Sequence, residues 1–494
     1  MKKSVLLFGF LIALGFQGYN QTYYYQSGGT VSKSGQAYTS SVQDTSGVLV
    51  TNLGVFILGH STIKTSGNSS NTDNSSKYGL NAGVLSKLGS WIRFTSDSVL
   101  TSGTGANGLF ATDSASRIDV TGGSITTGNN LAHGVDVTYG GAITLTNVNV
   151  TTTGASSSAL ATDFGGGTVT VSGGTIVAAA TTSGSHSAGI YSTGTITVAD
   201  ANVTSAGDNG AVIDVSGSIS LTNTNLTGAL NGLMVHNTTA GSSVGSFNIN
   251  GGSLTASGGD GIYTTGASAT ISFSGGAKIS ASSGNILNVV SSGITNFISS
   301  GDTLTGNFAC DNTSSFSVSL HAYSLVTGAI NAANASKMVS LTMDATSLWN
   351  LTAKSYVPVF LNQAGIEGDS VININGNGFD VVYDETNKKN TYLNTLKYKL
   401  RNGGWLTCPT CALGVEEASA GAMTIQCSPN PVTTVLDIRI NEPLAQQVSV
   451  YNTLGVKVCD LTVNGNAKVD VSNWVNGLYF FRMDNTTQRV IVMH

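Results

Sequence analysis

The cysteines are the first residues to consider for redox or metal chemistry. Five occur, an odd number, so they cannot all pair within one chain. Cys408 and Cys411 have the spacing of a redox dithiol, but they lie outside any strand–helix–strand unit. We therefore expect a local disulfide or two free thiols there. Zinc needs two more ligands at suitable spacing, so we expect no metal and no other cofactor. The cysteines are Cys310, Cys408, Cys411, Cys427 and Cys459.

Acid–base cleavage of a polysaccharide is the second chemistry that the residue types permit. It needs two carboxylates roughly 5 to 10 Å apart. No glutamate lies between residues 98 and 300, and the aspartates there fall at different offsets within the repeats described below. This irregularity predicts that most of them cap turns, so we expect no catalytic residue. The aspartates weighed for this role are Asp113, Asp136, Asp163 and Asp214.

A stripe of small polar residues is the candidate binding face. Each lies between two apolar residues of an alternating segment, so it points outward when its neighbours are buried. The stripe either keeps an exposed sheet soluble or binds a glycan or a host protein. Its members are Thr144, Thr170, Thr197, Ser220, Asn248 and Ser272.

A repeat positions these residues. Its six-residue pattern, exemplified by VSGGTI at 171–176, runs from an apolar residue through Gly, Asn or Asp at the third position to another apolar residue. Copies begin at residues 120, 145, 171, 198, 221, 249 and 273, which gives a mean step of 25.5 residues. Weaker copies at Phe94, Ile298, Leu320 and Met343 extend the array to about twelve coils.

The third position of each copy is a fixed corner, because Gly, Asn and Asp enter the left-handed region at low steric cost. Period-two alternation before each corner indicates a strand with one buried face. Such repeats cannot bury their apolar faces alone, so they must stack, and parallel connections are right-handed. The sequence predicts an all-β fold, a right-handed parallel β-helix of about 25 residues per coil. The corners are Gly122, Asn147, Gly173, Asp200, Asn223, Gly251 and Gly275.

Two N-terminal segments interrupt or precede the repeats. Residues 66–78 contain no Val, Ile or Leu and predict a loop extruded from an early coil. Residues 20–50 form either an N-terminal cap or a first coil. The chain itself begins with two lysines and a short apolar stretch, Val5–Phe16, which is typical of a signal peptide over residues 1–21.

The composition excludes two classes of function. Charged residues make up 10% of the chain and the net charge is -5, with no basic run. Nucleic-acid binding and binding to a membrane surface are therefore not expected. No segment after the signal peptide is long and apolar enough to span a bilayer, so we expect no integral membrane segment in the mature chain.

Two segments near the end of the predicted β-helix resemble parts of known surface β-helices. Residues 339–366 resemble the late coils of pertactin-like autotransporter passengers, in which a tryptophan is followed by a polar, an apolar and a threonine residue. Residues 378–406 look like the closing segment of such rods. Autotransporters end in a membrane β-barrel, whereas this chain has no run of long alternating strands at its end. The resemblance implies a capped surface rod.

The C-terminal segment resembles the sorting domain of type IX secretion cargo in Bacteroidetes. The motif order is Pro429-Asn430-Pro431, an alternating strand, VYN-x-LG ending at Gly455, and NGLYF with Gly477. The terminus carries one basic residue where the family usually has more. Turn residues at Pro431, Gly455 and Gly477 separate period-two strands and predict a small independent β-sandwich. The resemblance implies recognition by the type IX machinery and export to the medium or to the outer-membrane surface.

These observations give a domain plan and a function. The plan is a signal peptide at 1–21, a capped β-helix at 22–411, a linker at 412–423 and a sorting domain at 424–494. The expected function is that of a secreted or cell-surface adhesin-like protein without catalysis, with glycans or host surface proteins as partners. The alternative is a secreted polysaccharide lyase or glycoside hydrolase on the same fold.

Overall fold

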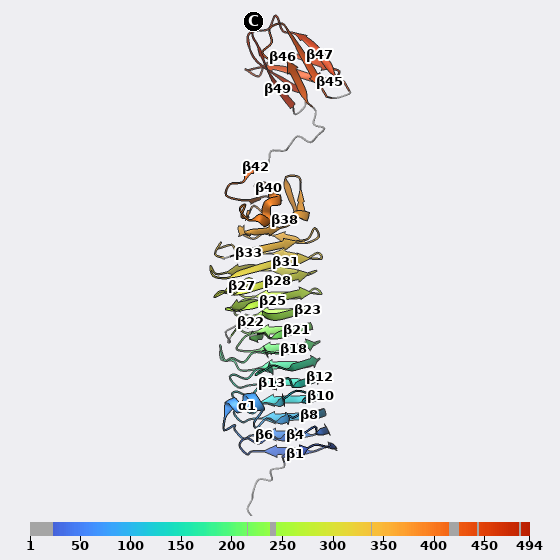
Figure 1. Cartoon of the computed structure of the whole chain (residues 1–494), viewed down its shortest axis with the longest axis vertical. Helices are drawn as coiled ribbons and strands as arrows, with labels where there is room; N and C mark the ends of the chain where they lie inside the picture. The colour runs from blue at the N-terminus through green and yellow to red at the C-terminus, as the bar shows by residue number, and fades with distance from the viewer. Residues whose placement is uncertain are drawn as a thin grey trace, which may run out of the picture. The chain divides into compact units, whose positions relative to one another are not determined.

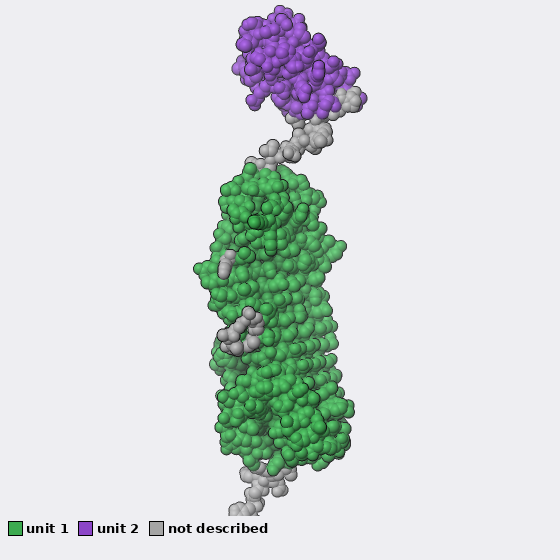
Figure 2. All heavy atoms as spheres, viewed as in Figure 1, with its two compact units in different colours: residues 1–414 green, residues 415–494 purple. Residues whose placement is uncertain are grey.

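The computed structural model describes residues 23–214, 216–237, 244–336, 338–413, 424–441, 444–483 and 486–494. The chain divides into two compact units, residues 1–414 and 415–494, which Figure 2 colours separately. Each unit has a hydrophobic core of its own. The expected signal peptide, residues 1–21, lies outside the described residues.

The first unit is a parallel β-solenoid of about 15 turns with about 25 residues per turn, which confirms the predicted fold class (Figure 1). Three parallel sheets enclose its core. Sheet 1 contains β1 (Tyr24–Ser27), β4 (Val48–Thr51), β7 (Val84–Ser86), β9 (Leu109–Thr112), β11 (Val135–Thr138), β14 (Leu160–Thr162), β17 (Ile190–Ser192), β20 (Ala211–Asp214), β22 (Leu233–His236), β24 (Ile262–Thr265), β27 (Asn285–Val290) and β30 (Asn307–Cys310).

Sheets 2 and 3 share several long strands that run around the corner between them. Sheet 2 contains β2 (Thr30–Ser34), β5 (Val55–Gly59), β8 (Trp91–Thr101), β10 (Arg117–Thr127), β12 (Ala142–Thr146), β15 (Thr168–Ser172), β18 (Thr195–Ala199), β21 (Ser218–Gly228), β23 (Val244–Ala256), β25 (Ser268–Ser274), β28 (Ile294–Ser300), β31 (Ser315–His321), β33 (Met338–Met343) and β36 (Val359–Leu361). Sheet 3 contains β3 (Ala37–Ser40), β6 (Thr62–Thr65), β13 (Asn149–Thr152), β16 (Thr175–Ala178), β19 (Asn202–Ser205) and β26 (Lys278–Ala281), with β8, β10, β21 and β23.

The predicted repeat sets the register of sheet 2. Each predicted start pairs with the start of the next coil, from Val120 and Leu145 through to Ile249 and Phe273. The inward positions stack as columns of buried Ile, Leu, Val and Phe, such as Ile118, Ile143 and Val169. Because parallel strands bury this column continuously, each coil supplies the apolar surface that its neighbours need.

The corner prediction is confirmed at every copy. All seven corner residues have positive φ angles, between 47° at Asn223 and 73° at Gly173. Only small turn-forming side chains fit there, because each corner stacks on the one in the next coil. A Cβ atom at Gly173 would lie 2.2 Å from Oδ1 of Asn147.

Gly173→Val should therefore lower the free energy of unfolding by more than about 1 kcal/mol, because a β-branched side chain is forced into the left-handed region. Urea unfolding followed by circular dichroism measures the loss. Gly173→Asn is the matched control and should cost less, since asparagine already occupies the equivalent corner at Asn147 and Asn223. Equal stability of the wild type and the valine variant would contradict the corner assignment.

The loop predicted over residues 66–78 carries a short α-helix, α1 (Thr72–Tyr78). The Asn71 side chain caps it by accepting a hydrogen bond of 3.0 Å from the Asn74 backbone N–H, and Gly79 ends it at a φ of 69°. The insertion lengthens one coil to 36 residues, since Leu58 pairs with Phe94. The helix covers part of the outer face of sheet 1, where the Thr138 hydroxyl donates a hydrogen bond of 2.9 Å to the carbonyl of Lys77.

Two further predictions need adjustment. Residues 24–65 form complete coils and not a cap, which contributes to the larger number of turns than the predicted twelve. The weak copy at Ile298 is wrong by one residue, because Phe273 pairs with Ser299. Ser299 tolerates the buried position because its hydroxyl donates a hydrogen bond of 3.1 Å to Asp302. In the described residues between 94 and 298, the chain forms strands and turns without a helix.

The C-terminal end of the solenoid closes with a further sheet, in which β40 and β41 pair antiparallel. Cys408 and Cys411 form a disulfide there. The sheet and its two 3₁₀ helices comprise β29 (Thr303–Thr305), β32 (Leu325–Thr327), β34 (Leu348–Asn350), β35 (Ser355–Tyr356), η1 (Gln363–Gly365), β37 (Ile366–Glu367), β38 (Ser370–Asn375), β39 (Val381–Val382), η2 (Lys388–Leu393), β40 (Leu396–Arg401), β41 (Trp405–Thr407) and β42 (Ala412–Leu413). Because β42 pairs with β40, the solenoid extends two residues beyond the expected boundary at 411. The rest of the expected linker, residues 414–423, lies outside the described residues.

The second unit is the predicted small β-sandwich. Its two antiparallel sheets bury Ile438, Val450 and Phe481 between them. The first sheet contains β43 (Ile425–Ser428), β44 (Val435–Ile440) and β47 (Asn466–Asp470). The second contains β46 (Lys457–Val463), β45 (Gln446–Asn452), β48 (Gly477–Met483) and β49 (Thr486–Val492).

Candidate functional site

The predicted polar stripe lies in one line along the outer face of sheet 2. Each member pairs with the next one in the adjacent coil, so the structure brings all six together in register. Asn248 is exposed and the other five are half-buried by their neighbours. The face is continuous and polar, and its role in binding stays a prediction.

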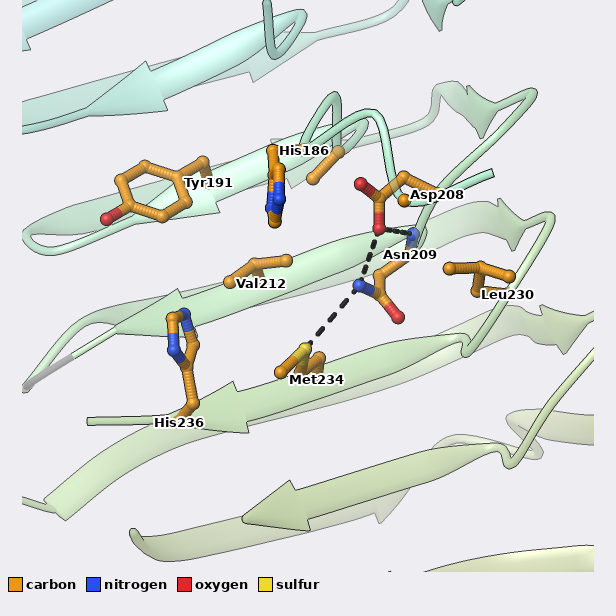
Figure 3. Close-up of a pocket in the computed structure, with 10 residues that line it drawn as sticks. His186, Tyr191, Asp208, Asn209, Val212, Leu230, Met234 and His236 are labelled. Carbon is orange, nitrogen blue, oxygen red and sulfur yellow. Dashed lines mark hydrogen bonds between the residues drawn. The ribbon is translucent and has the colours of Figure 1, made fainter. Parts of the chain in front are cut away.

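The outer face of sheet 1 holds a pocket of about 490 Å³ (Figure 3). Tyr191 of β17, Val212 of β20 and Met234 of β22 lie in line on three consecutive coils and form part of its lining. Ile190 pairs with Ala211, whose side chain points inward, so Val212 points outward. The other lining residues are Gly184, His186, Ala188, Asp208, Asn209, Leu230 and His236.

The turn that precedes sheet 1 supplies a rigid polar wall to this pocket. Both the backbone N–H and the side-chain amide of Asn209 donate hydrogen bonds of 2.7 Å to Oδ1 of Asp208. Oδ2 of Asp208 accepts a bond of 3.1 Å from the Ser187 backbone N–H. The side-chain carbonyl oxygen of Asn209 accepts a hydrogen bond of 2.9 Å from the side-chain amide of Asn231 in the next coil. These fixed donors and acceptors stand beside an apolar surface, as in small-molecule sites.

A carboxylate lies at the tyrosine end of the pocket. The Tyr191 hydroxyl donates a hydrogen bond of 3.0 Å to Oδ2 of Asp214, which is buried. Burial raises the pKa of Tyr191, and the negative charges of Asp214 and Asp163 raise it further. Asp214 also pairs in the ladder with His236, another lining residue. An acidic region therefore adjoins the pocket at Tyr191.

Asp163 occupies the same position as Asp214, two coils earlier. Asp163 follows Thr162 and Asp214 follows Ile213, and both Thr162 and Ile213 pair with Ser192 of the intervening coil. Asp163 is half-buried and accepts a bond of 2.9 Å from the Phe164 backbone N–H. Burial raises the pKa of Asp163, and the charge of Asp214 adds to the rise.

Asp136 is the third carboxylate of this region. It is fully buried, and neither of its carboxylate oxygens has a hydrogen-bond partner. The Val137 backbone N–H lies near this carboxylate but makes no hydrogen bond of normal geometry with it. Burial raises the pKa of Asp136 well above its usual range, and the charge of Asp163 raises it further.

The aspartates therefore depart from the sequence prediction. Asp113 caps a turn, since its carboxylate accepts a bond of 3.2 Å from the Leu88 backbone N–H, and Asp163 also caps one. Asp136 lies inside strand β11 and caps nothing, so that assignment was wrong. The sequence does contain a signal for the alignment of Asp163 and Asp214. Each aspartate lies four residues after the small residue that precedes its sheet 1 strand, which is Ala159 for Asp163 and Gly210 for Asp214.

The described residues contain neither a metal-binding group nor a membrane-spanning helix. Within them, no three His, Cys, Asp or Glu side chains are grouped so as to hold a metal ion. The helices found there are too short or too polar to cross a bilayer.

The predicted sorting motif holds the C-terminal strand of the second unit in place. The side-chain amide of Asn430 donates a hydrogen bond of 2.8 Å to the backbone carbonyl of Arg489. The side-chain carbonyl oxygen of Asn430 accepts one of 2.8 Å from the backbone N–H of Ile491. Pro429 and Pro431 flank this contact. Gly455 turns between β45 and β46 at a φ of 74°. Gly477 does not form a turn as predicted but begins β48, where it pairs with Val492.

Comparison with known proteins supports this part of the interpretation. No curated protein matches the chain. Residues 427–493 match the family described as secretion system C-terminal sorting domain, which lies within the predicted range of 424–494. The chain thus carries a type IX sorting domain and is exported, either into the medium or onto the outer-membrane surface.

Proposed function

We propose that this protein is an adhesin-like surface rod that binds an uncharged polysaccharide in the sheet 1 pocket. The pocket carries the proposal, because its apolar lining of Tyr191, Val212 and Met234 lies beside fixed amide and carboxylate groups. Sugar rings present apolar C–H faces and hydroxyl edges, which match such a mixed surface. The resemblance of residues 339–366 to pertactin-like passengers supports a surface rod, and that of the C-terminal unit to type IX cargo supports an origin in Bacteroidetes.

The charged residues in and near the pocket indicate which class of polysaccharide it binds. Among the described residues, the lining of the pocket includes Asp208 but no lysine or arginine, and Asp214 adjoins the pocket. Between residues 98 and 300 the sequence contains one arginine, Arg117, and one lysine, Lys278. A chain of uronic acids needs cations to balance its carboxylates. The site therefore favours neutral glycans over acidic ones.

Binding should be lost when the pocket is filled. We expect Met234→Arg to weaken binding of the exported protein to a neutral polysaccharide at least tenfold, as measured by affinity electrophoresis in gels containing laminarin, galactomannan, xyloglucan or starch. Thr197→Arg, on the polar stripe of sheet 2, is the matched control and should bind normally. Loss of binding in Thr197→Arg alone would place the site on the stripe. Absence of binding to every neutral polymer would contradict the proposal.

A further inference from the structure

Aromatic side chains that do not belong to a buried core gather on one face of the solenoid. Between residues 94 and 300 the sequence contains nine aromatic residues, of which five are buried phenylalanines. The other four lie in sheet 1 strands or in the turns that follow them, whereas the outer face of sheet 2 carries the polar stripe. Contiguous exposed apolar groups mark interaction sites. The four residues are Tyr139, Phe164, Tyr191 and Tyr263.

Tyr191 and Tyr263 form the two ends of one apolar column. Tyr191 pairs with Val212, which pairs with Met234 in the next coil, and Figure 3 shows these three on consecutive strands. Met234 in turn pairs with Tyr263. Neighbouring coils are about 4.8 Å apart, so the two tyrosine positions are separated by about 14 Å along the rod. The column therefore extends the pocket by one coil and has an aromatic ring at each end.

A ladder of polar side chains runs beside this column, in the turns that precede the same strands. Asn231 donates a hydrogen bond to Asn209, and its side-chain oxygen accepts one of 2.9 Å from the Asp260 backbone N–H. The Asp260 carboxylate accepts bonds of 2.9 Å and 2.8 Å from the side-chain amides of Asn285 and Asn288. Asn209 and Asp260 are 6% and 8% exposed, so their positions are fixed. Apolar surface and fixed polar groups thus lie side by side in each coil from β20 to β24.

Phe164 and Tyr139 continue this surface toward the N-terminus. Ala161 pairs with Tyr191, and Phe164 stands three residues beyond Ala161 in the preceding coil. The Tyr191 side chain is directed toward the same ends of the strands, because its hydroxyl bonds Asp214, the last residue of β20. The Tyr139 backbone N–H donates a hydrogen bond of 3.0 Å to the Phe164 carbonyl, so these two residues lie in adjacent turns.

Helix α1 holds these two rings in place. Tyr78 stacks on Tyr139 with the ring centroids 5.9 Å apart, and Nζ of Lys77 lies 5.1 Å from the centroid of Phe164. Tyr139 is nevertheless 40% exposed and Phe164 37% exposed. Rings that are already fixed lose little conformational entropy when a ligand binds.

We propose that a linear, β-1,4-linked neutral glycan lies lengthwise along this aromatic track, from Tyr139 past Tyr191 to Tyr263. The proposal rests on the proposed binding function and adds the orientation, the length and the linkage of the ligand. Aromatic faces pack against the apolar C–H faces of sugar rings, and the ladder can bond the hydroxyl groups at the ring edges. A β-1,4-linked chain is extended and presents ring faces along its whole length. Chains with α-1,4 or β-1,3 linkages coil away from a straight line of contacts.

The charges beside the track favour a neutral glycan over a polyanion or a second copy of the rod. The carboxylates of Asp163, Asp208 and Asp214 lie beside the track and outnumber the cation described there, Lys77. In a symmetric dimer the same patch of both copies meets itself, which would bring these carboxylates together. A neutral chain meets no such repulsion.

Isothermal titration calorimetry of the purified exported protein with cello- and manno-oligosaccharides tests the proposal. We expect the affinity to rise by about tenfold or more from the disaccharide to the hexasaccharide, because each added contact acts on a chain that is already bound. Tyr263→Ala should remove most of this rise and leave disaccharide binding unchanged. Tyr263→Phe, which keeps the ring, should retain the rise. Tyr25→Ala, at an exposed tyrosine of β1, is the matched control and should behave like the wild type.

The outcomes separate this proposal from pocket binding. Equal affinity for every chain length, or a wild-type rise in folded Tyr263→Ala, overturns the track and leaves the pocket as the binding site. Absence of binding to every neutral glycan overturns both. Tighter binding of malto- or laminari-oligosaccharides overturns the linkage assignment. A wild-type dimer that dissociates in Tyr263→Ala, as measured by light scattering, would assign the face to a second copy. The length and linkage dependence of the wild type decides the proposal even where a variant fails to fold.

Discussion

Deleting residues 424–494 should leave a folded solenoid that no longer reaches the cell surface. The two units have separate hydrophobic cores, so removing the second leaves the core of the first intact. The deleted segment contains the whole match to the sorting domain family, residues 427–493. We expect surface and secreted protein to fall at least tenfold in a cell competent for type IX secretion, while the truncated chain accumulates in the periplasm. Cell fractionation followed by immunoblotting measures this.

A fusion provides the complementary test of the same unit. Residues 424–494 attached to an unrelated folded protein behind a signal peptide should bring that protein to the surface. A finer variant is Asn430→Ala, which removes both hydrogen bonds to the terminal strand β49 and should reduce export more than Asn464→Ala in the turn before β47. Truncated protein outside the outer membrane in normal amounts would contradict the sorting role.

The repeats could be predicted because each position is fixed by a local requirement that recurs in every coil. Gly122, Asn147 and Gly173 occupy the same left-handed corner, and that corner restricts residue type whatever surrounds it. Alternation around Ile118 and Ile143 reports a buried face directly. Seven copies of the repeat made its spacing unambiguous. The strand register, the corner residues and the buried residues could therefore be predicted from the same alignment.

The predictions that were wrong concern places where the regular repeat is interrupted. Helix α1 has only seven residues, and all but Lys77 are Thr, Asp, Asn, Ser or Tyr, which have modest helix propensity. Its caps and its contact with sheet 1 stabilise it. The Ile298 copy was shifted because a buried serine, Ser299, takes an inward position through a hydrogen bond with Asp302. A hydropathy pattern does not reveal such a bond.

The pocket could not be read from the sequence because its residues come from separate coils joined by turns of unequal length. Tyr191, Val212 and Met234 are neighbours only after Ile190 is aligned with Ala211. The number of residues from the start of a sheet 2 repeat to the following aspartate includes turns of variable length. The aspartates therefore fall at different offsets when they are counted in this way. Counting from the start of each sheet 1 strand removes that scatter and places Asp163 and Asp214 in line.

Asp136 should make the stability of the rod fall as the pH rises. Burial raises its pKa in the folded state well above the value of about 3.9 in an unfolded chain. Between those two values the folded protein holds a proton that the unfolded chain has lost, so the free energy of unfolding decreases with increasing pH. One such group changes it by up to about 1.4 kcal/mol per pH unit. The stabilising effect is complete below pH 4 and is lost as the pH passes the folded pKa.

Asp136→Asn keeps the size of the side chain and removes this ionisation. We expect the variant to be more stable than the wild type at pH 8, to show little difference at pH 4, and to lose much of the decrease between them in urea titrations at several pH values. Asp113→Asn, at a half-buried turn, controls for the loss of one aspartate and should keep the wild-type slope. A wild-type slope in Asp136→Asn would show that this carboxyl is ionised and has found a partner in the folded rod.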